Sequence, residues 1–217
     1  MDKETLNGQS KHWQETFDNK PDMFGEEPSY AAIKSVTLFK EEGKTKILEL
    51  GCGQGRDTIF FAKQGLQVHA LDYCESGINP MSQKVAGLGL DESITALCHD
   101  VRNPLPFDDD SFDACYSHML FCMALTMAEL EYLSGEIRRV LKPGGLNIYT
   151  VRNTNDAHYK TGIHRGEDMY EVGGFIVHFF SQEKVERLAK GFEIVEVEAF
   201  VEGELPKKLF MVELRKL

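Results

Sequence analysis

The residues best suited to chemistry are an acid and three glycines at the end of a short apolar run. The run Ile47 to Leu50 contains Glu49 and leads into Gly51-Cys52-Gly53-Gln54-Gly55. Glycine permits left-handed backbone angles and leaves no side chain between the main chain and a ligand. A dinucleotide-binding turn has the spacing G-x-G-x-x-G and holds a pyrophosphate, whereas this spacing is G-x-G-x-G. Because a carboxylate repels phosphate and attracts cations, Glu49 favours a cofactor without phosphate.

Two further acids follow apolar runs. Asp72 ends the run Gln67 to Asp72, about twenty residues beyond the glycine turn, where a carboxylate can bond both hydroxyls of a ribose. Asp72 could instead cap a helix that starts near Glu75. Asp100 follows the run Ile94 to Cys98. An acid in a loop is ordinarily just solvated, so the prediction for Asp100 depends on its place after a strand.

Strand-like and helix-like patterns alternate along the chain and would position these acids. Short apolar runs predict buried parallel strands, and Gly or Pro residues end the helical patterns between them. Two β-rich runs at 192–201 and 207–215, joined by residues 202–206, predict an antiparallel hairpin. The expected strands are 47–50, 67–72, 94–98, 112–117 and 146–151, and the expected helices start near 28, 57, 78, 128 and 182. The pattern indicates an α/β fold.

The motif Ile47 to Gly55 resembles the first motif of the class I S-adenosylmethionine-dependent methyltransferases. S-adenosylmethionine carries a sulfonium and an ammonium but no phosphate, which fits an acidic turn. The resemblance covers nearly the whole chain, including the run Arg138 to Gly145. It implies a Rossmann-like three-layer sandwich, with a seven-stranded, mostly parallel sheet that ends in a C-terminal antiparallel hairpin. S-adenosyl-L-homocysteine would be the product of the cofactor.

Within that family, residues 22–29 look like the lead-in of the tellurite-resistance and thiol-type small-molecule methyltransferases. The resemblance implies that residues 1–27 form an N-terminal lid, in which Trp13, Met23 and Phe24 fold over the cofactor. The same residues could equally anchor a terminal helix to the body of the protein. We expect a short helix around Trp13, followed by a turn at Pro21-Asp22.

The resemblance also implies roles for individual residues. Glu49 and the glycine turn would border the methionine half of the cofactor, Asp72 would hold the ribose, and Asp100 and Val101 would bond the adenine. The expected cofactor-binding residues are Trp13, Phe24, Glu49, Leu50, Gly51, Cys52, Gly53, Arg56, Asp57, Asp72, Tyr73, Cys74, Asp100, Val101, Ser117 and His118.

The acceptor side is less defined. Methyltransferases that act on adenine or amide nitrogens usually place Asn or Asp, two prolines and an aromatic residue after the fourth strand. This chain has Ser117-His118-Met119-Leu120 there, which disfavours exocyclic amine and glutamine acceptors. Residues 152–175 are polar and lack a clear period. A connection of this length is often functional, so we expect an acceptor-side loop there.

The expected chemistry is direct displacement of a sulfonium methyl group, for which the protein supplies alignment and excludes water. A thiolate or a chalcogen oxyanion needs no strong base. The alternative acceptor is a hydroxyl or carboxyl group of a small metabolite, and a hydroxyl would need a general base from His118, His164 or His178.

Two other classes of protein remain open. A nicotinamide dehydrogenase shares the fold, but Glu49 and the glycine spacing oppose it; a non-catalytic S-adenosylmethionine-binding protein would keep the cofactor residues.

Composition limits the remaining possibilities. With 217 residues and 42% hydrophobic content, the chain is expected to form a single domain over residues 1–217. No signal-peptide or membrane-spanning pattern is present, so a cytoplasmic monomer or homodimer is expected. The net charge of −11 argues against nucleic-acid partners, which leaves a small-molecule acceptor. The five cysteines form no C-x-x-C pair, which predicts reduced thiols and no metal site.

Overall fold

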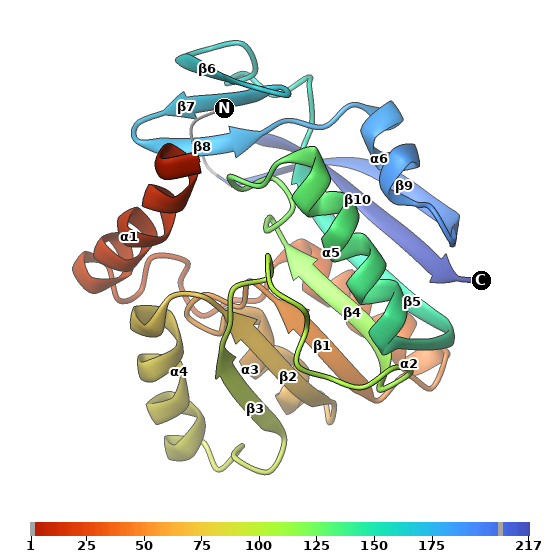
Figure 1. The fold of residues 1–217 in the computed structure, drawn as a ribbon. Helices are drawn as coiled ribbons and strands as arrows, with labels where there is room; N and C mark the ends of the chain where they lie inside the picture. The colour runs from red at the N-terminus through yellow and green to blue at the C-terminus, as the bar shows by residue number, and fades with distance from the viewer. Residues whose placement is uncertain (1–2, 204–205) are drawn as a thin grey trace.

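The computed structural model describes residues 3–203 and 206–217. Met1 and Asp2, at the start of the N-terminal segment, lie outside this range. Glu204 and Leu205 of the expected hairpin turn also lie outside it. One seven-stranded sheet dominates the fold (Figure 1). Across the sheet, the order is β3 (Ile94–Cys98), β2 (Gln67–Asp72), β1 (Lys46–Leu50), β4 (Phe112–His118), β5 (Leu141–Arg152), β10 (Lys207–Lys216) and β9 (Phe192–Glu202).

The direction of the strands agrees with the expected topology. The strand β1 pairs in parallel with β2 on one side and with β4 on the other, so the strand order reverses at β1. Open α/β sheets bind ligands at such a point, beyond the carboxyl ends of the strands. The strand β10 runs antiparallel to both β5 and β9. The mostly parallel sheet with a C-terminal antiparallel hairpin is therefore confirmed.

Helices cover both faces of the sheet and complete the three layers. Ile47 and Val68 pack with α2 (Tyr30–Glu41), α3 (Arg56–Lys63) and α4 (Glu75–Gly87) in one apolar core. Leu48 and Leu50 belong to the other core, with α5 (Met127–Val140) and α6 (Gln182–Leu188). Successive residues of a strand point to opposite faces, which is why β1 contributes to both cores.

Some helices start at residues other than those expected. Gly55, at φ 82°, is the N-cap of α3, so the helix begins at Arg56 and not at Asp57. The helix α4 begins at Glu75, earlier than expected, and contains Pro80. Ser29 caps α2, and its side chain accepts a hydrogen bond from the amide of Ala32.

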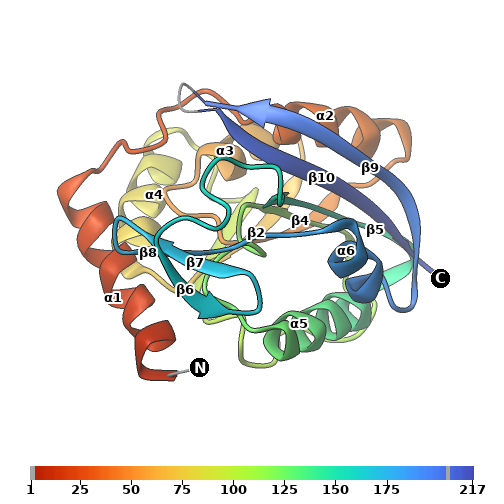
Figure 2. The same cartoon turned by 90° about the horizontal axis from the view of Figure 1, so that it is seen from above.

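Two segments gave weak sequence signals and are more ordered than expected. The segment expected to be an irregular loop contains β6 (Ile163–Gly166) and β7 (Met169–Val172), which form a three-stranded antiparallel sheet with β8 (Phe175–His178). The N-terminal helix α1 (Lys3–Asn19) is longer than the short helix expected around Trp13. Seen from above, this small sheet lies over the carboxyl edge of the main sheet, with α1 beside it (Figure 2).

All five cysteines are free thiols, and four of them are buried; Cys98 is exposed. Among the residues that the structure describes, no helix is both long enough and apolar enough to cross a membrane.

Candidate active site

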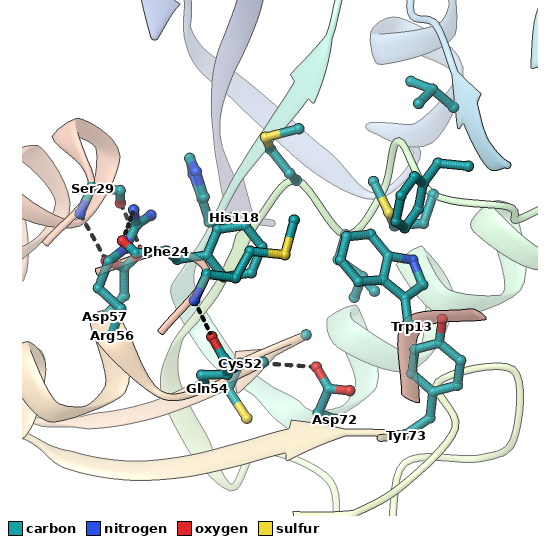
Figure 3. A pocket seen from close by; sticks show the side chains of 18 of the residues that line it. Trp13, Phe24, Ser29, Cys52, Gln54, Arg56, Asp57, Asp72, Tyr73 and His118 are labelled. Carbon is teal, nitrogen blue, oxygen red and sulfur yellow. Dashed lines mark hydrogen bonds and ion pairs between the residues drawn. The ribbon is translucent and has the colours of Figure 1, made fainter. Parts of the chain in front are cut away.

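A cavity of about 1060 Å³ lies between the carboxyl edge of the main sheet and the roof formed by α1 and the small sheet. Its lining follows the order of the strands. Asp100, Asp72 and Glu49 come from the β3, β2 and β1 side, and His118, Arg152 and Lys207 from β4, β5 and β10. The volume is at the upper end for a single-ligand pocket, so a nucleoside cofactor and a second small molecule can fit together. In Figure 3 the labelled side chains surround one space, with Ser29, Arg56 and Asp57 on one side and Trp13 and Tyr73 on the other.

The glycine turn needs its glycines. Gly51, Gly53 and Gly55 have φ values of 71°, 53° and 82°, which side chains rarely permit. A Cβ at Gly55 would lie 2.2 Å from the sulfur of Met81, and a Cβ at Gly51 would lie 3.1 Å from Leu120. The amides of Gly51 and Cys52 donate to the carbonyl of Leu71, which fixes the turn against β2. The turn thus presents bare backbone to the cavity.

Glu49 is the buried acid of this turn. Its side chain is almost fully buried, and among the described residues Oε2 has no hydrogen-bond partner. Burial and, secondarily, the Asp57 carboxylate raise the pKa of Glu49 to about 8. A cation in the cavity would relieve both effects, because it would pair with the ionised carboxylate. This orphaned acid therefore fits an ammonium-bearing ligand.

Asp72 supports the turn directly. Its carboxylate accepts hydrogen bonds from the amide of Gly53 at 2.8 Å and from the amide of Cys74 at 2.9 Å. Burial raises the pKa of Asp72, whereas these hydrogen bonds act in the opposite direction. Each carboxylate oxygen can accept more than one hydrogen bond, so both oxygens keep capacity for ligand hydroxyls. The helix cap considered from the sequence is present only as the bond to Cys74, the N-cap of α4.

Asp57 has a mainly structural set of partners. It accepts hydrogen bonds from the amide and hydroxyl of Ser29 at 2.8 and 2.7 Å and from Tyr116 Oη at 3.0 Å. Arg56 Nε lies 3.3 Å from Asp57, and the Arg56 guanidinium lies over the ring of Phe24. This network joins the starts of α2 and α3 to β4, so Asp57 shapes the wall of the cavity.

The third acid is already paired. Arg102 donates to both carboxylate oxygens of Asp100. Burial works against ionisation, but the hydrogen bonds from Arg102 outweigh it and lower the pKa of Asp100. Tyr73 and Val101 line the cavity beside this pair.

The roof is held to α1 by a side-chain bridge. Gln9 donates through Nε2 to the carbonyl of Gly174 and accepts through Oε1 from the amide of Ile176, both at 3.0 Å. Next to it, the ring centroids of Trp13 and Phe175 lie 4.7 Å apart. Trp13 and Phe24 both line the cavity. Trp13 therefore lines the cavity and anchors α1 to the small sheet, and its role as a lid over the cofactor stays a prediction.

His118 lies in the middle of the cavity wall, at the end of β4. Its Nε2 is 3.0 Å from Glu202 Oε2, and its Nδ1 is 3.0 Å from the hydroxyl of Thr150. Burial alone would raise the pKa of Glu202, but the hydrogen bond and charge of His118 lower it. The carboxylate and the hydroxyl orient the imidazole, as in other catalytic sites where a third group positions a base.

A group on the β5 side lies partly within the expected acceptor-side loop 152–175, but sequence reasoning did not single out Arg152, Glu202 or Lys207. Arg152 contacts Asp156 and His158, and both Arg152 and His158 line the cavity together with Lys207 and Glu202. No motif joins these residues, which come from β5, the following turn and the hairpin. A long polar segment between two strands was the only signal.

Several expected site residues lie outside the cavity lining. Leu50 points into the apolar core, since it alternates with Glu49 along β1, and Ser117 alternates with His118 in the same way on β4. Cys74 is buried at the start of α4. His164 stacks on Tyr170 in the small sheet, with ring centroids 4.9 Å apart.

His178 is also outside the cavity lining. It is fully buried, with Nδ1 2.8 Å from the carbonyl of Leu125 and Nε2 2.9 Å from Lys184 Nζ. Burial, with the charge of Lys184, lowers the pKa of His178 to about 4. Of the three histidines proposed as bases, only His118 lines the cavity.

Comparisons with known proteins agree with this geometry. A family described as a methyltransferase domain matches residues 47–145. The chain is 38% identical over 155 residues to phosphoethanolamine N-methyltransferase 1 of Triticum aestivum. The match covers 66% of this chain and 28% of that protein. The chain is 28% identical over 197 residues to 24-methylenesterol C-methyltransferase 2 of Arabidopsis thaliana, with 84% of this chain and 52% of that protein covered. It thus spans between about a quarter and a half of these relatives.

A solved structure shares the fold over nearly the full length. The Burkholderia thailandensis 1,6-didemethyltoxoflavin-N1-methyltransferase, which holds its substrate and S-adenosylhomocysteine, gives a TM-score of 0.75 at 17% identity and covers 98% of this chain and 89% of that one. At this identity the likeness concerns the fold. Together, the matched domain, the curated relatives and the strand order show that the chain belongs to the class I S-adenosylmethionine-dependent methyltransferases.

Proposed function

We propose that the protein transfers the methyl group of S-adenosylmethionine to a small molecule held beside His118. The observation that carries the proposal is the division of one cavity along the sheet edge. Acids and bare backbone lie at β1 to β3, where Arg102 is paired with Asp100 and Arg56 lies beside Asp57. A paired imidazole and further basic side chains lie at β4, β5 and β10. Methyl donor and acceptor would therefore meet near the end of β4.

The residues at the first end fit S-adenosylmethionine. Glu49, with its unpartnered oxygen, would face the ammonium, and Asp72 would take the ribose hydroxyls. Tyr73, Asp100 and Val101 would enclose the adenine. When bound, the cofactor supplies a methyl group on a sulfonium. The neutral thioether that remains after transfer is a good leaving group. The unpartnered acid supports this donor over a nicotinamide dinucleotide, because an ammonium would stabilise the ionised form of Glu49, whereas a pyrophosphate would oppose its ionisation.

The acceptor nucleophile is proposed to be a thiol, a chalcogen oxyanion or a hydroxyl. The reaction forms a bond from the acceptor atom to the methyl carbon, while the bond from that carbon to sulfur breaks and its electrons stay on sulfur. A protonated acceptor also loses a proton, which His118 would take at Nδ1 after the acceptor replaces the hydroxyl of Thr150 there, while Nε2 stays bonded to Glu202. Glu202 stabilises the resulting imidazolium. A thiolate or an oxyanion reaches the site already ionised and needs only alignment.

Transfer of labelled methyl from S-adenosylmethionine to a panel of thiols, oxyanions and phenols tests this proposal. We expect product with at least one class, and loss of product when Asp72 is replaced by Asn. Tight binding of S-adenosylmethionine without any product, at pH values from 6 to 9, would favour the non-catalytic alternative. Binding of NADH in place of S-adenosylmethionine would reject the proposal altogether.

A further inference from the structure

A set of hydrogen-bond donors lies at the β5 and β10 end of the cavity, away from the acids. Arg152 is only 7% exposed and lines the cavity. Its Nε and Nη2 atoms donate to the two carboxylate oxygens of Asp156. Among the described residues, Nη1 makes no hydrogen bond. A buried guanidinium is thus fixed by one carboxylate and keeps one nitrogen for another partner.

His158 adds a second donor. Its Nδ1 lies 3.0 Å from Nη2 of Arg152, and its amide donates to Asp156. Because a guanidinium can only donate, Nδ1 must accept this hydrogen bond. The ring is therefore neutral, with its proton on Nε2. His158 lines the cavity, so this N–H is a donor within the site.

Lys207 adds a third donor, at the start of β10. It lines the cavity, and within residues 3–203 and 206–217 its side chain has no hydrogen bond or ion pair. Its cross-strand neighbour Glu202 has its carboxylate 3.0 Å from His118. Lys207 therefore brings a positive charge to this end of the cavity, where it also acts electrostatically on the carboxylate of Glu202.

We propose that Arg152, His158 and Lys207 form a subsite for one carboxylate-type monoanion carried by the methyl acceptor. This inference rests on the proposed function, since it describes the acceptor of the same site. Three donors from three segments face a region in which each nearby acid already has a partner. Hydrogen bonds from a charged donor to an anion are stronger than those between neutral groups. The planar guanidinium of Arg152 also matches the planar shape of a carboxylate.

The local charge favours a single negative charge on the acceptor. Arg152 is balanced by Asp156, His158 is neutral, and the charge of Lys207 acts on Glu202, so the subsite offers directed donors without a large surplus of positive charge. A phosphate monoester, with a charge of about −1.5 to −2, would be left partly uncompensated. A carboxylate or sulfonate would match the subsite.

The position of the subsite separates the anion from the reacting atom. Neighbouring strands lie about 4.8 Å apart, so β5 is about 5 Å and β10 about 10 Å from β4, near whose end the methyl group would be transferred. The anion is therefore an anchor several bonds away from the nucleophile. Val172, Phe175 and Val177 line the roof of the cavity, which indicates an apolar body between the two groups.

Binding of two probes that differ in charge tests the subsite. The probes are 4-hydroxybenzoate and its isosteric amide, 4-hydroxybenzamide, titrated at pH 7 into the full chain saturated with S-adenosylhomocysteine. The phenol of both remains protonated at this pH, so only the carboxylate differs. We expect the acid to bind at least tenfold more tightly than the amide, and phenyl phosphate to bind less tightly than the acid.

Variants assign the effect to the subsite. Lys207→Gln and Arg152→Gln should each reduce acid binding about tenfold and leave amide binding unchanged. Lys208→Gln is the matched control, because Lys208 is exposed and outside the cavity lining, and it should bind both probes as the parent does. Arg152→Gln leaves Asp156 without its ion-pair partner, although the amides of His158 and Lys208 still donate to it. If this variant does not fold, the binding data for Lys207→Gln still test the subsite.

The inference is overturned if the parent binds the acid no more tightly than the amide, or if Lys207→Gln keeps the full preference. Tighter binding of phenyl phosphate would overturn the assignment to a monoanion. Labelled methyl transfer is measured separately with the panel of thiols, oxyanions and phenols. A parent that prefers the acid but transfers no methyl group would refute the proposed function and leave the anion subsite standing.

Discussion

His118 Nε2 lies 3.0 Å from Oε2 of Glu202, although the two residues end β4 and β9, which are separated in the sheet by β5 and β10. The end of the C-terminal hairpin therefore reaches back over the carboxyl edge of the sheet. Both side chains are mostly buried, so this pair is better shielded from solvent than a surface ion pair. The relationship places a carboxylate behind the only proposed base that lines the cavity.

Replacing His118 with Gln should reduce kcat toward a hydroxyl acceptor by about 10²- to 10⁴-fold, the usual contribution of a general base. For an alkyl thiol the reduction should shrink above a pH of about 8.5, where the thiolate forms without help. Profiles of kcat against pH for both acceptors measure this. An equal loss for both acceptors at every pH would instead indicate a structural role for His118.

Replacing Glu202 with Gln should affect the same proton transfer. Residues that act as a unit are not additive, so the double variant of His118 and Glu202 should lose no more activity than His118→Gln alone. Single and double variants assayed with one hydroxyl acceptor give the answer. Losses that multiply would show that the two side chains act independently.

Glu49→Gln should stabilise the ligand-free protein and weaken cofactor binding. The pKa of Glu49 is about 8 in the fold and 4.5 ordinarily, so the unfolded chain binds fewer protons between these values. Stability from this group is fully present below about pH 4.5 and is lost as pH rises through about 8. A glutamine at position 49 does not ionise, so the variant does not lose this stability at high pH. The gain in Tm should therefore be larger at pH 9 than at pH 6.

The same substitution removes the partner of a bound ammonium. Calorimetry with S-adenosylhomocysteine should show weaker binding to Glu49→Gln than to the parent. In the parent, affinity should rise from pH 6 to pH 8, because binding a cation releases the proton from Glu49. Affinity that is flat over this range would contradict the pairing.

Two buried tyrosines should respond oppositely to loss of the hydroxyl. Tyr116 Oη bonds Asp57 at 3.0 Å and Ser29 at 2.9 Å, so Tyr116→Phe should reduce the free energy of unfolding by about 1 kcal/mol or more. Tyr149 is equally buried, but its hydroxyl has no partner among the described residues. Tyr149→Phe should be neutral or stabilising. Urea denaturation of both variants measures the difference, and similar losses would be inconsistent with the network.

Gln9→Ala should loosen the roof of the cavity. The change removes both hydrogen bonds from α1 to the small sheet, at Gly174 and Ile176. Dissociation of S-adenosylhomocysteine should become faster, and amides of α1 should exchange with solvent more readily. Lys11→Ala is the matched control, because the Lys11 side chain is 82% exposed on the same helix. Identical dissociation rates for the two variants would show that α1 does not retain the ligand.

Much of the fold could be read from local patterns. The runs 47–50 and 67–72 are apolar and end in acids, so their burial and their common edge follow from strand periodicity and parallel pairing. The small sheet could not be read in this way. Residues 163–166 and 169–172 form strands of only four residues without clear alternation, and their order depends on packing against α1.

The sequence by itself determined the parallel sheet, its glycine turn and the acids after the strands, because each depends on residues close together in the chain. Only the tertiary structure decided that His118 meets Glu202, that Arg152 is held by Asp156 beside Lys207, and that His178 is buried with Lys184. The contact of His118 with Glu202 joins distant strands, and the contacts of Arg152 and His178 with their partners lie in segments without a periodic signal. They arise where the hairpin, β5 and the small sheet converge on one edge, so burial and charge there are properties of the packed molecule.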